Sequence, residues 1–202
     1  MSHRGRFIVL EGGEACGKST QARLLAARLD ALFTFEPGAT ELGQLMRRIV
    51  LDPESHHLDA RAEALLIAAD KAQHVRAIIE PALVSGRDVV CDRFVDSALA
   101  YQGFGRGLDL EQLERVLDFA TGGLRPDLVL LLEVSDGIAD ARLGGQRDRL
   151  EAESAAFHRR VRDGFRSLAS ADPKRWAVID GEGSIDDVSA RIDRVLHERL
   201  VV

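Results

Sequence analysis

The chain has 202 residues, 46% of them hydrophobic, and a formal net charge of -6. This length and composition predict a single domain with a well-buried core. The acidic balance argues against a nucleic-acid-binding surface, although local basic clusters could still bind a small anion. No apolar run approaches the roughly 18 residues that span a bilayer, and the run at 7–10 is too short for a signal peptide. We therefore expect a soluble, cytoplasmic protein without a membrane partner.

A glycine-rich loop follows the first apolar run directly. Residues 12–19 read Gly-Gly-Glu-Ala-Cys-Gly-Lys-Ser and fit the G-x-x-x-x-G-K-[ST] phosphate-binding pattern. The predicted strand 7–10 precedes this loop, and a helical pattern at 20–29 follows it. In such loops the backbone N–H groups surround phosphate oxygens at the positive end of the helix. The sequence thus predicts a nucleotide enzyme. The expected nucleotide-binding residues are Gly12, Gly13, Glu14, Ala15, Cys16, Gly17, Lys18, Ser19 and Thr20.

Apolar runs alternate with helical patterns along the rest of the chain, which is typical of a parallel sheet covered on both faces. Strands are predicted at residues 7–10, 32–35, 88–91, 127–134 and 176–179. Further helices are predicted at residues 59–84, 111–120, 152–168 and 185–200. The pattern predicts an α/β, doubly wound, three-layer P-loop NTPase fold with a five-stranded parallel sheet.

Polar residues at the carboxyl ends of these strands are the candidates for chemistry, because ligands bind there in such folds. Lys18 is placed to reach the β- and γ-phosphates, and the Ser19 hydroxyl is placed to hold a bridging Mg²⁺. Asp92 follows the strand at 88–91 and suits Mg²⁺ or its waters. Its neighbour Arg93 can contact a phosphate through two N–H groups. A structural ion pair between Asp92 and Arg93 is the alternative.

Several longer segments carry a more specific pattern. Residues 92–103 read Asp-Arg-Phe-Val-Asp-Ser-Ala-Leu-Ala-Tyr-Gln-Gly. Further characteristic segments are residues 11–20, 35–40, 65–74, 125–128 and 148–151. Together they resemble the thymidylate kinases over nearly the whole length of the chain. The resemblance implies Mg²⁺-dependent phosphoryl transfer from ATP to dTMP, giving dTDP and ADP for dTTP biosynthesis.

The resemblance also implies a binding site for dTMP. Glu14 would meet the sugar 3′-hydroxyl, and Tyr101 would crowd the sugar 2′ position. Arg93 and Arg47 would hold the acceptor phosphate from two sides. Helix capping by Glu14, core packing of Tyr101 and a solvated position for Arg47 are the alternatives. The implied dTMP-binding residues are Glu14, Glu36, Arg47, Ile67, Lys71, Arg93, Ser97, Tyr101 and Gln102.

Positive charge around the moving γ-phosphoryl group is the main device that this reaction needs from the protein. Some thymidylate kinases carry an arginine inside the phosphate loop, where this chain has Ala15 and Cys16. The resemblance therefore implies that a short lid at about residues 142–151, rich in arginine, supplies the charge. A solvated helix face is the alternative for Arg142. The expected catalytic residues are Lys18, Arg93, Arg142, Arg147 and Arg149.

Two positions depart from the family pattern. Ile67 stands where a phenylalanine normally stacks on thymine, so a stacking contribution of about 1 kcal/mol is lost. Lys71 replaces an arginine and offers a point charge instead of a planar fork. These changes predict weaker dTMP affinity, a broader range of acceptors, or compensation by neighbouring side chains.

Three other functions compete with this interpretation. A nucleoside monophosphate kinase with broader base specificity is the first. A nucleotide-dependent switch protein is disfavoured, since the guanine motif Asn-Lys-x-Asp of GTPases needs asparagine and the chain has none. A deoxynucleoside kinase would need a base for a neutral 5′-hydroxyl, whereas a phosphate acceptor is already ionised. Family members are usually homodimers, and apolar positions within 59–84 could face a partner helix or the core. We expect a homodimer that binds ATP and dTMP.

Overall fold

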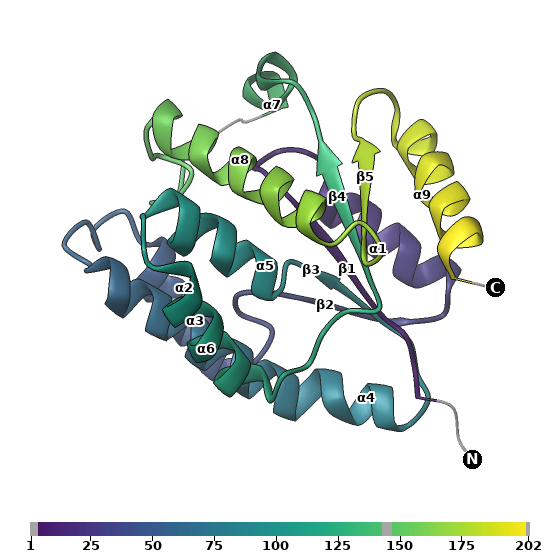
Figure 1. Cartoon of the computed structure of the whole chain (residues 1–202), viewed down its shortest axis with the longest axis horizontal. Coiled ribbons are helices and arrows are strands. Elements are labelled where there is room, and N and C mark those ends of the chain that lie inside the picture. Colours follow the sequence, from purple (N-terminus) through teal and green to yellow (C-terminus); the bar gives the residue numbers. More distant parts are fainter. Residues whose placement is uncertain (1–3, 143–146, 201–202) are drawn as a thin grey trace.

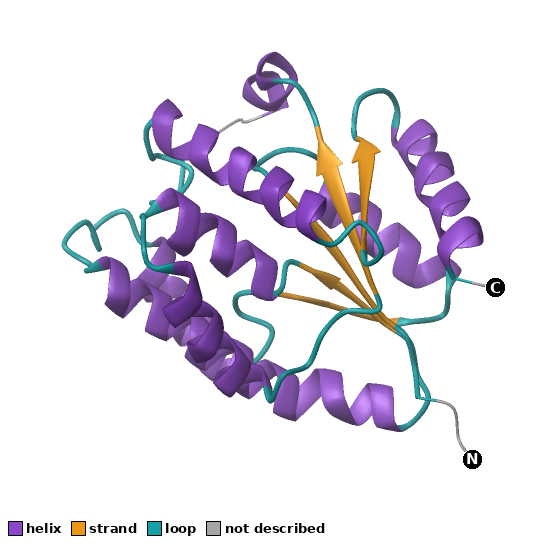
Figure 2. Ribbon diagram, in the orientation of Figure 1, coloured by secondary structure: helices purple, strands orange, loops and turns teal. Residues whose placement is uncertain are grey.

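The structure is a computed structural model, and it describes residues 4–142 and 147–200. Its described residues form one parallel five-stranded sheet with the order β2-β3-β1-β4-β5 (Figure 2). The strands are β1 (Phe7–Gly12), β2 (Leu32–Phe35), β3 (Val89–Asp92), β4 (Leu128–Glu133) and β5 (Trp176–Asp180). All five lie within two residues of the predicted ranges, and the predicted α/β fold with a parallel sheet is confirmed.

Helices cover both faces of this sheet (Figure 1). The α-helices are α1 (Lys18–Arg28), α2 (Glu41–Leu51), α3 (Ala60–His74), α4 (Glu80–Val84), α5 (Val95–Ala98), α6 (Leu110–Thr121), α7 (Asp136–Arg142), α8 (Ala155–Ala171) and α9 (Ile185–Arg199). Two π-helical segments are η1 (Val75–Ile79) and η2 (Leu99–Gly105). None of the helices in the described residues has the length and apolar character needed to cross a membrane.

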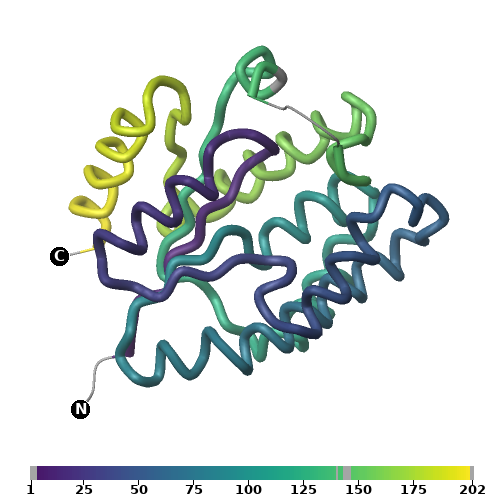
Figure 3. The backbone as a smooth tube through the Cα atoms, turned by 180° about the vertical axis from the view of Figure 1, so that it is seen from behind, coloured from purple at the N-terminus to yellow at the C-terminus, as the bar shows by residue number. Residues whose placement is uncertain are grey.

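The central strand β1 shows how the core is divided into two layers. Successive side chains of a strand point to opposite faces, so Phe7 and Val9 pack with apolar residues of α3 and α6. Ile8 and Leu10 point the other way and pack with α1 and α9. Seen from behind, α1 and α9 lie side by side over the sheet (Figure 3). Burial on both faces explains why this strand reads as a continuous apolar run.

The helix predicted at 59–84 is present as α3, η1 and α4 in succession, and the middle segment widens into a π-helix. Asp59 caps its start, because its side chain accepts a hydrogen bond from the Arg61 N–H. Pro81 lies within the first residues of α4 and has no N–H to donate to the preceding turn. We attribute the wider turn at 75–79 to this missing hydrogen bond.

Candidate active site

The phosphate loop leaves β1 with an unusual backbone. Gly12 and Gly17 have φ angles of 147° and 91°, and Ala15 lies in the left-handed region at 55°. A Cβ on Gly12 would come within 2.5 Å of the Leu132 carbonyl oxygen, so only glycine fits there. The Lys18 ammonium group donates to the Gly13 carbonyl at 2.8 Å, across the loop. Helix α1 begins at Lys18, and its positive end therefore adjoins the loop.

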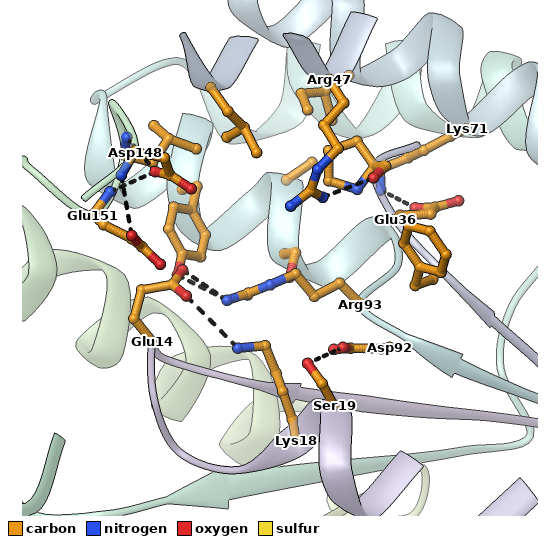
Figure 4. A pocket seen from close by; sticks show the side chains of 18 of the residues that line it. Glu14, Lys18, Ser19, Glu36, Arg47, Lys71, Asp92, Arg93, Asp148 and Glu151 are labelled. Carbon is orange, nitrogen blue, oxygen red and sulfur yellow. Dashed lines mark hydrogen bonds and ion pairs between the residues drawn. The ribbon is translucent and has the colours of Figure 1, made fainter. Parts of the chain in front are cut away.

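Ser19 and Asp92 meet where α1 starts and β3 ends. The Ser19 hydroxyl donates to Oδ2 of Asp92 (Figure 4). The other carboxylate oxygen, Oδ1, is buried and has no hydrogen-bond partner among the described residues. Buried carboxylate oxygens are normally paired, and Mg²⁺ prefers oxygen ligands. The pair therefore fits a Mg²⁺ ion, or a water molecule bound to one, beside the phosphate loop.

Arg93 follows Asp92 and has a φ angle of 71°, which is rare for a side chain of this size. The partly buried guanidinium group donates to Glu14 at 2.8 Å and to the Gly12 carbonyl at 3.0 Å. It also donates to the hydroxyls of Ser97 and Tyr101, at 3.1 and 3.2 Å. Arg93 thus joins the phosphate loop to the segment that begins at α5.

Glu14 lies inside the phosphate loop and points toward cationic groups. Its Oε1 accepts a hydrogen bond from the Tyr101 hydroxyl at 2.5 Å as well as from Arg93. Burial alone would raise the pKa of Glu14, but the charges of Arg93 and Lys18 and the Tyr101 hydroxyl lower it to about 2. This carboxylate is therefore ionised at neutral pH and holds Arg93 and Tyr101 in place.

A pocket of about 480 Å³ opens beside these residues. Its walls are contributed by the phosphate loop, the end of β2, α2, α3, α5 and η2. The structure brings together in this pocket every residue of the predicted dTMP set, namely Glu14, Glu36, Arg47, Ile67, Lys71, Arg93, Ser97, Tyr101 and Gln102.

Lys71 lies in a buried ionic network at one wall of the pocket. Its ammonium group donates to Glu36 and, at 2.8 Å, to the Phe94 carbonyl. His74 Nδ1 lies 2.8 Å from the same carboxylate, and its Nε2 lies 2.6 Å from the Thr34 hydroxyl. Burial would raise the pKa of Glu36, but Lys71 and His74 keep it below its ordinary value. The charge of Lys71 is thus largely neutralised within the protein.

The lid arginines occupy different surroundings. Arg142 lies near the phosphate loop, with both terminal nitrogens 3.4 Å from the Gly181 carbonyl oxygen. Arg147 lines a second pocket, of about 620 Å³, beside Gly13 and Glu14. Residues 143–146 of the predicted lid lie outside the described residues.

Arg149 is bound to residues of α2 and α3. Its guanidinium group donates to the Val50 carbonyl at 2.7 Å and to Glu63 at 2.5 Å. Glu63 is a fully buried carboxylate, and such a group requires cationic or hydrogen-bonding partners. The structure therefore does not bring Arg149 together with Lys18, although the sequence placed both in the catalytic set.

The sequence reasoning missed several residues of this site. Phe33 and Phe35 line the pocket and stack with their ring centres 6.3 Å apart. They could have been predicted, because both lie in a predicted strand, at whose carboxyl end ligands bind in such folds. Asp148 and Glu151 also line the pocket. His74 does not line it but contacts the carboxylate of Glu36, which does. Glu63 was missed as well, because a polar residue on a helix normally indicates a solvent-facing position.

The sheet order, the phosphate loop and the adjoining pocket, which Arg47, Lys71 and Arg93 line, are those of a P-loop kinase. The model of the thymidylate kinase family matches residues 10–192. The chain is 50% identical to a thymidylate kinase of Synechococcus sp. (strain JA-3-3Ab), over 96% of this chain and 97% of that protein. It is 43% identical to a thymidylate kinase of Geobacter sp. (strain M21), over 97% of this chain and 93% of that protein.

Structural similarity agrees with these sequence matches. The crystal structure of thymidylate kinase from Ehrlichia chaffeensis superposes with a TM-score of 0.80 at 30% identity, covering 96% of this chain and 99% of that one. The chain belongs to the thymidylate kinase family and is an ATP-dependent phosphotransferase.

Proposed function

We propose that the protein transfers the γ-phosphoryl group of ATP to dTMP, giving dTDP and ADP for dTTP biosynthesis. The observation that carries this proposal is that all nine predicted dTMP-binding residues line one pocket, of about 480 Å³, beside the phosphate loop. Membership of the thymidylate kinase family supplies the substrates.

On the ATP side, residues 12–20 would surround the phosphates, and Lys18 would contact the β- and γ-phosphates. Ser19 and Asp92 would hold Mg²⁺, since one carboxylate oxygen of Asp92 is buried without a partner in the described residues. When bound, the ion neutralises charge on the β- and γ-phosphate oxygens. The backbone N–H groups of the loop would also stabilise this negative charge, and they need no reorganisation to do so.

On the acceptor side, the dTMP phosphate would lie between Arg93 and Arg47. Arg93 is held in advance by Glu14 and Tyr101, so little conformational entropy is lost on binding. Glu14 would contact the 3′-hydroxyl, and the Tyr101 ring would exclude a 2′-hydroxyl. The acceptor phosphate is already ionised and needs no general base.

The lid at about 142–151 would complete the site. Arg142 and Arg147 are the arginines on the phosphate-loop side and would meet the transferring group. Closure over ATP would exclude water and so prevent hydrolysis. Arg149, which is bound to Glu63 and the Val50 carbonyl, would anchor the carboxyl end of this segment.

A second candidate function, a monophosphate kinase with broader base specificity, is favoured by two observations. Ile67 lines the pocket where a stacking ring would select thymine. Lys71 is committed to Glu36 and to the Phe94 carbonyl, which reduces its capacity to bind the substrate. Phe33 and Phe35 provide aromatic surface in the same pocket and would compensate for Ile67.

The deciding experiment measures ADP release with ATP and Mg²⁺ against dTMP, dUMP, UMP, dCMP, dGMP and AMP. The native protein is compared with Ile67→Phe, for which we expect kcat/KM for dTMP to rise about fivefold, the equivalent of one stacking contact. A strong dTMP preference of the native protein supports the proposal. If the native protein phosphorylates many of these monophosphates and Ile67→Phe accepts fewer, the second function is favoured. If neither protein is active with any acceptor, both proposed functions are contradicted.

A homodimer is also part of the proposal. Exposed apolar side chains lie on the neighbouring helices α2, α3 and α6, among them Leu45, Leu65 at 58% exposure and Phe119 at 91%. Apolar surface on adjacent elements is typical of a protein interface. The mass of the protein measured by light scattering distinguishes a dimer from a monomer. A cytoplasmic location, Mg²⁺ dependence and the lack of a nucleic-acid partner remain predictions.

A further inference from the structure

Glu63 is a charged residue with no exposed surface, and the proposed mechanism uses it only to hold Arg149. It lies on α3 one turn before Ile67 and two turns before Lys71, so all three occupy the same side of the helix. Ile67 and Lys71 both line the pocket of about 480 Å³ in which dTMP is proposed to bind, called the acceptor pocket from here on. Glu63 is thus buried directly behind the wall of that pocket.

The contacts of Glu63 connect the pocket to the lid. Its Oε1 accepts a hydrogen bond from Gln102 Nε2 at 2.9 Å. Its Oε2 accepts from Arg149 at 2.5 Å and lies 3.2 Å from a guanidinium nitrogen of Arg106. Burial would raise the pKa of Glu63, but the hydrogen bonds from Gln102, Arg149 and Arg106 keep it below its ordinary value. The group is therefore a carboxylate, which can only accept hydrogen bonds.

This property fixes which end of the Gln102 amide faces the pocket. An amide has a donor end and an acceptor end of nearly the same shape. Because an ionised carboxylate cannot donate, the NH₂ group of Gln102 must be the end that faces Glu63. No donor among the described residues forms a hydrogen bond to Gln102 Oε1, and Gln102 lines the acceptor pocket. The amide oxygen of Gln102, Oε1, therefore faces the pocket and can accept a hydrogen bond there.

A carbonyl oxygen at this position distinguishes pyrimidine bases. The N3 atom of thymine or uracil carries a hydrogen and donates, whereas N3 of cytosine carries a lone pair and accepts. A buried polar group that is left without its partner discriminates strongly against the wrong ligand. An oxygen fixed toward N3 would thus bind thymine and oppose cytosine.

We propose that Glu63 is a positioning residue that determines base specificity, because it orients the Gln102 amide so that Oε1 accepts a hydrogen bond from thymine N3–H. The inference rests on the proposed binding of dTMP in this pocket. A structural role for Glu63, confined to holding Arg106 and Arg149, is the alternative.

The test compares Glu63→Gln with Glu153→Gln, its matched control. Both variants neutralise one carboxylate that is bound to Arg106, but in the structure only Glu63 contacts Gln102. The side chain of Glu63→Gln can donate as well as accept, so it no longer fixes the orientation of Gln102. We expect the ratio of kcat/KM for dTMP to that for dCMP to fall about tenfold in Glu63→Gln. The dTMP to dUMP ratio should stay constant, since both bases carry N3–H.

The amount of active enzyme cancels in the ratio of kcat/KM for dTMP to that for dCMP. If Glu63 had a purely structural role, its replacement would lower both activities and leave this ratio unchanged. An unchanged dTMP to dCMP ratio in Glu63→Gln, or an equal fall in Glu153→Gln, would overturn the inference. Adding Gln102→Ala should abolish the effect of Glu63→Gln on the ratio, because Glu63 is inferred to act through that amide.

A crystal structure of the native protein with dTMP gives an answer even where a variant does not fold. Gln102 Oε1 at hydrogen-bond distance from N3, with Nε2 still on Glu63, supports the inference, and a Gln102 turned from either partner overturns it. Failure of the native protein to phosphorylate dTMP would instead refute the proposed function.

Discussion

The phosphate loop and the acceptor pocket share one edge of the sheet but are built in different ways. The loop is one short segment whose shape comes from backbone angles at Gly12, Ala15 and Gly17. The pocket is assembled from residues far apart in the chain and is held by buried ion pairs such as Lys71 with Glu36. ATP binding thus depends on local geometry, whereas acceptor recognition depends on charges that must find their partners after folding.

The largest effect is expected from Lys18→Ala, which removes the principal side-chain charge of the loop. The ammonium group lies over the loop at 2.8 Å from the Gly13 carbonyl, where the phosphates would bind. We expect kcat to fall about a thousandfold, because a fixed charge at the transferring group is lost. Steady-state assays with saturating ATP and dTMP measure this. The control is Arg115→Ala, which breaks an exposed ion pair on α6 and should change kcat less than twofold.

Arg93→Lys tests the acceptor side while keeping the charge. Lysine cannot reproduce the four hydrogen bonds that Arg93 donates to Glu14, Gly12, Ser97 and Tyr101. We expect kcat/KM for dTMP to fall about a hundredfold, with less than a threefold change in KM for ATP. Initial rates at varied concentrations of each substrate separate the two. If kcat/KM fell equally for dTMP and for ATP, the acceptor pocket and the phosphate loop would not act independently.

The smallest expected effect concerns Glu11, which joins the two regions. Glu11 is the next-to-last residue of β1, beside the phosphate loop. Its carboxylate accepts hydrogen bonds from the backbone N–H groups of Phe94 and Ser97, at 2.9 and 3.1 Å. Burial, and then the charge of Asp96, raise the pKa of Glu11 to about 7 from 4.5. Between these values the folded protein binds more protons than the unfolded chain, so stability falls as pH rises.

We expect the free energy of unfolding to decrease by about 1 kcal/mol between pH 5 and pH 6 on account of Glu11. Urea unfolding of the native protein and of Glu11→Gln at both pH values measures this difference. The variant should lack this part of the pH dependence. Identical slopes for the two proteins would show that Glu11 has the same pKa in the folded and unfolded states.

The elements that could be predicted from the sequence are those with a local signal. The five strands were found because each is an apolar run bounded by polar residues, and the loop because its motif is contiguous. The helical segment at 95–105 was not predicted. Almost all of its residues are buried, so its sequence has no polar face and no helical periodicity.

The pocket could be predicted only where the family resemblance supplied the residues. The nine residues expected to bind dTMP do line one pocket. Glu63 and His74, which bind Gln102 and Glu36 of that set, stand in no sequence pattern that would reveal this role. A charged residue on a helix predicts solvent exposure, and only the packed structure shows that Glu63 has none. For the same reason the contact of Arg149 with Glu63 could not be foreseen.

The left-handed backbone of Arg93, with φ at 71°, has a consequence for the evolution of the protein. Glycine would relieve a backbone cost of about 1 kcal/mol at this position, yet it would remove the guanidinium group that neutralises Glu14. Removing one partner of a buried ion pair costs about 3–5 kcal/mol, so the contacts of the guanidinium group outweigh the backbone cost. A library screened for thermal stability alone should therefore retain arginine at position 93, although a smaller residue would fit its backbone better.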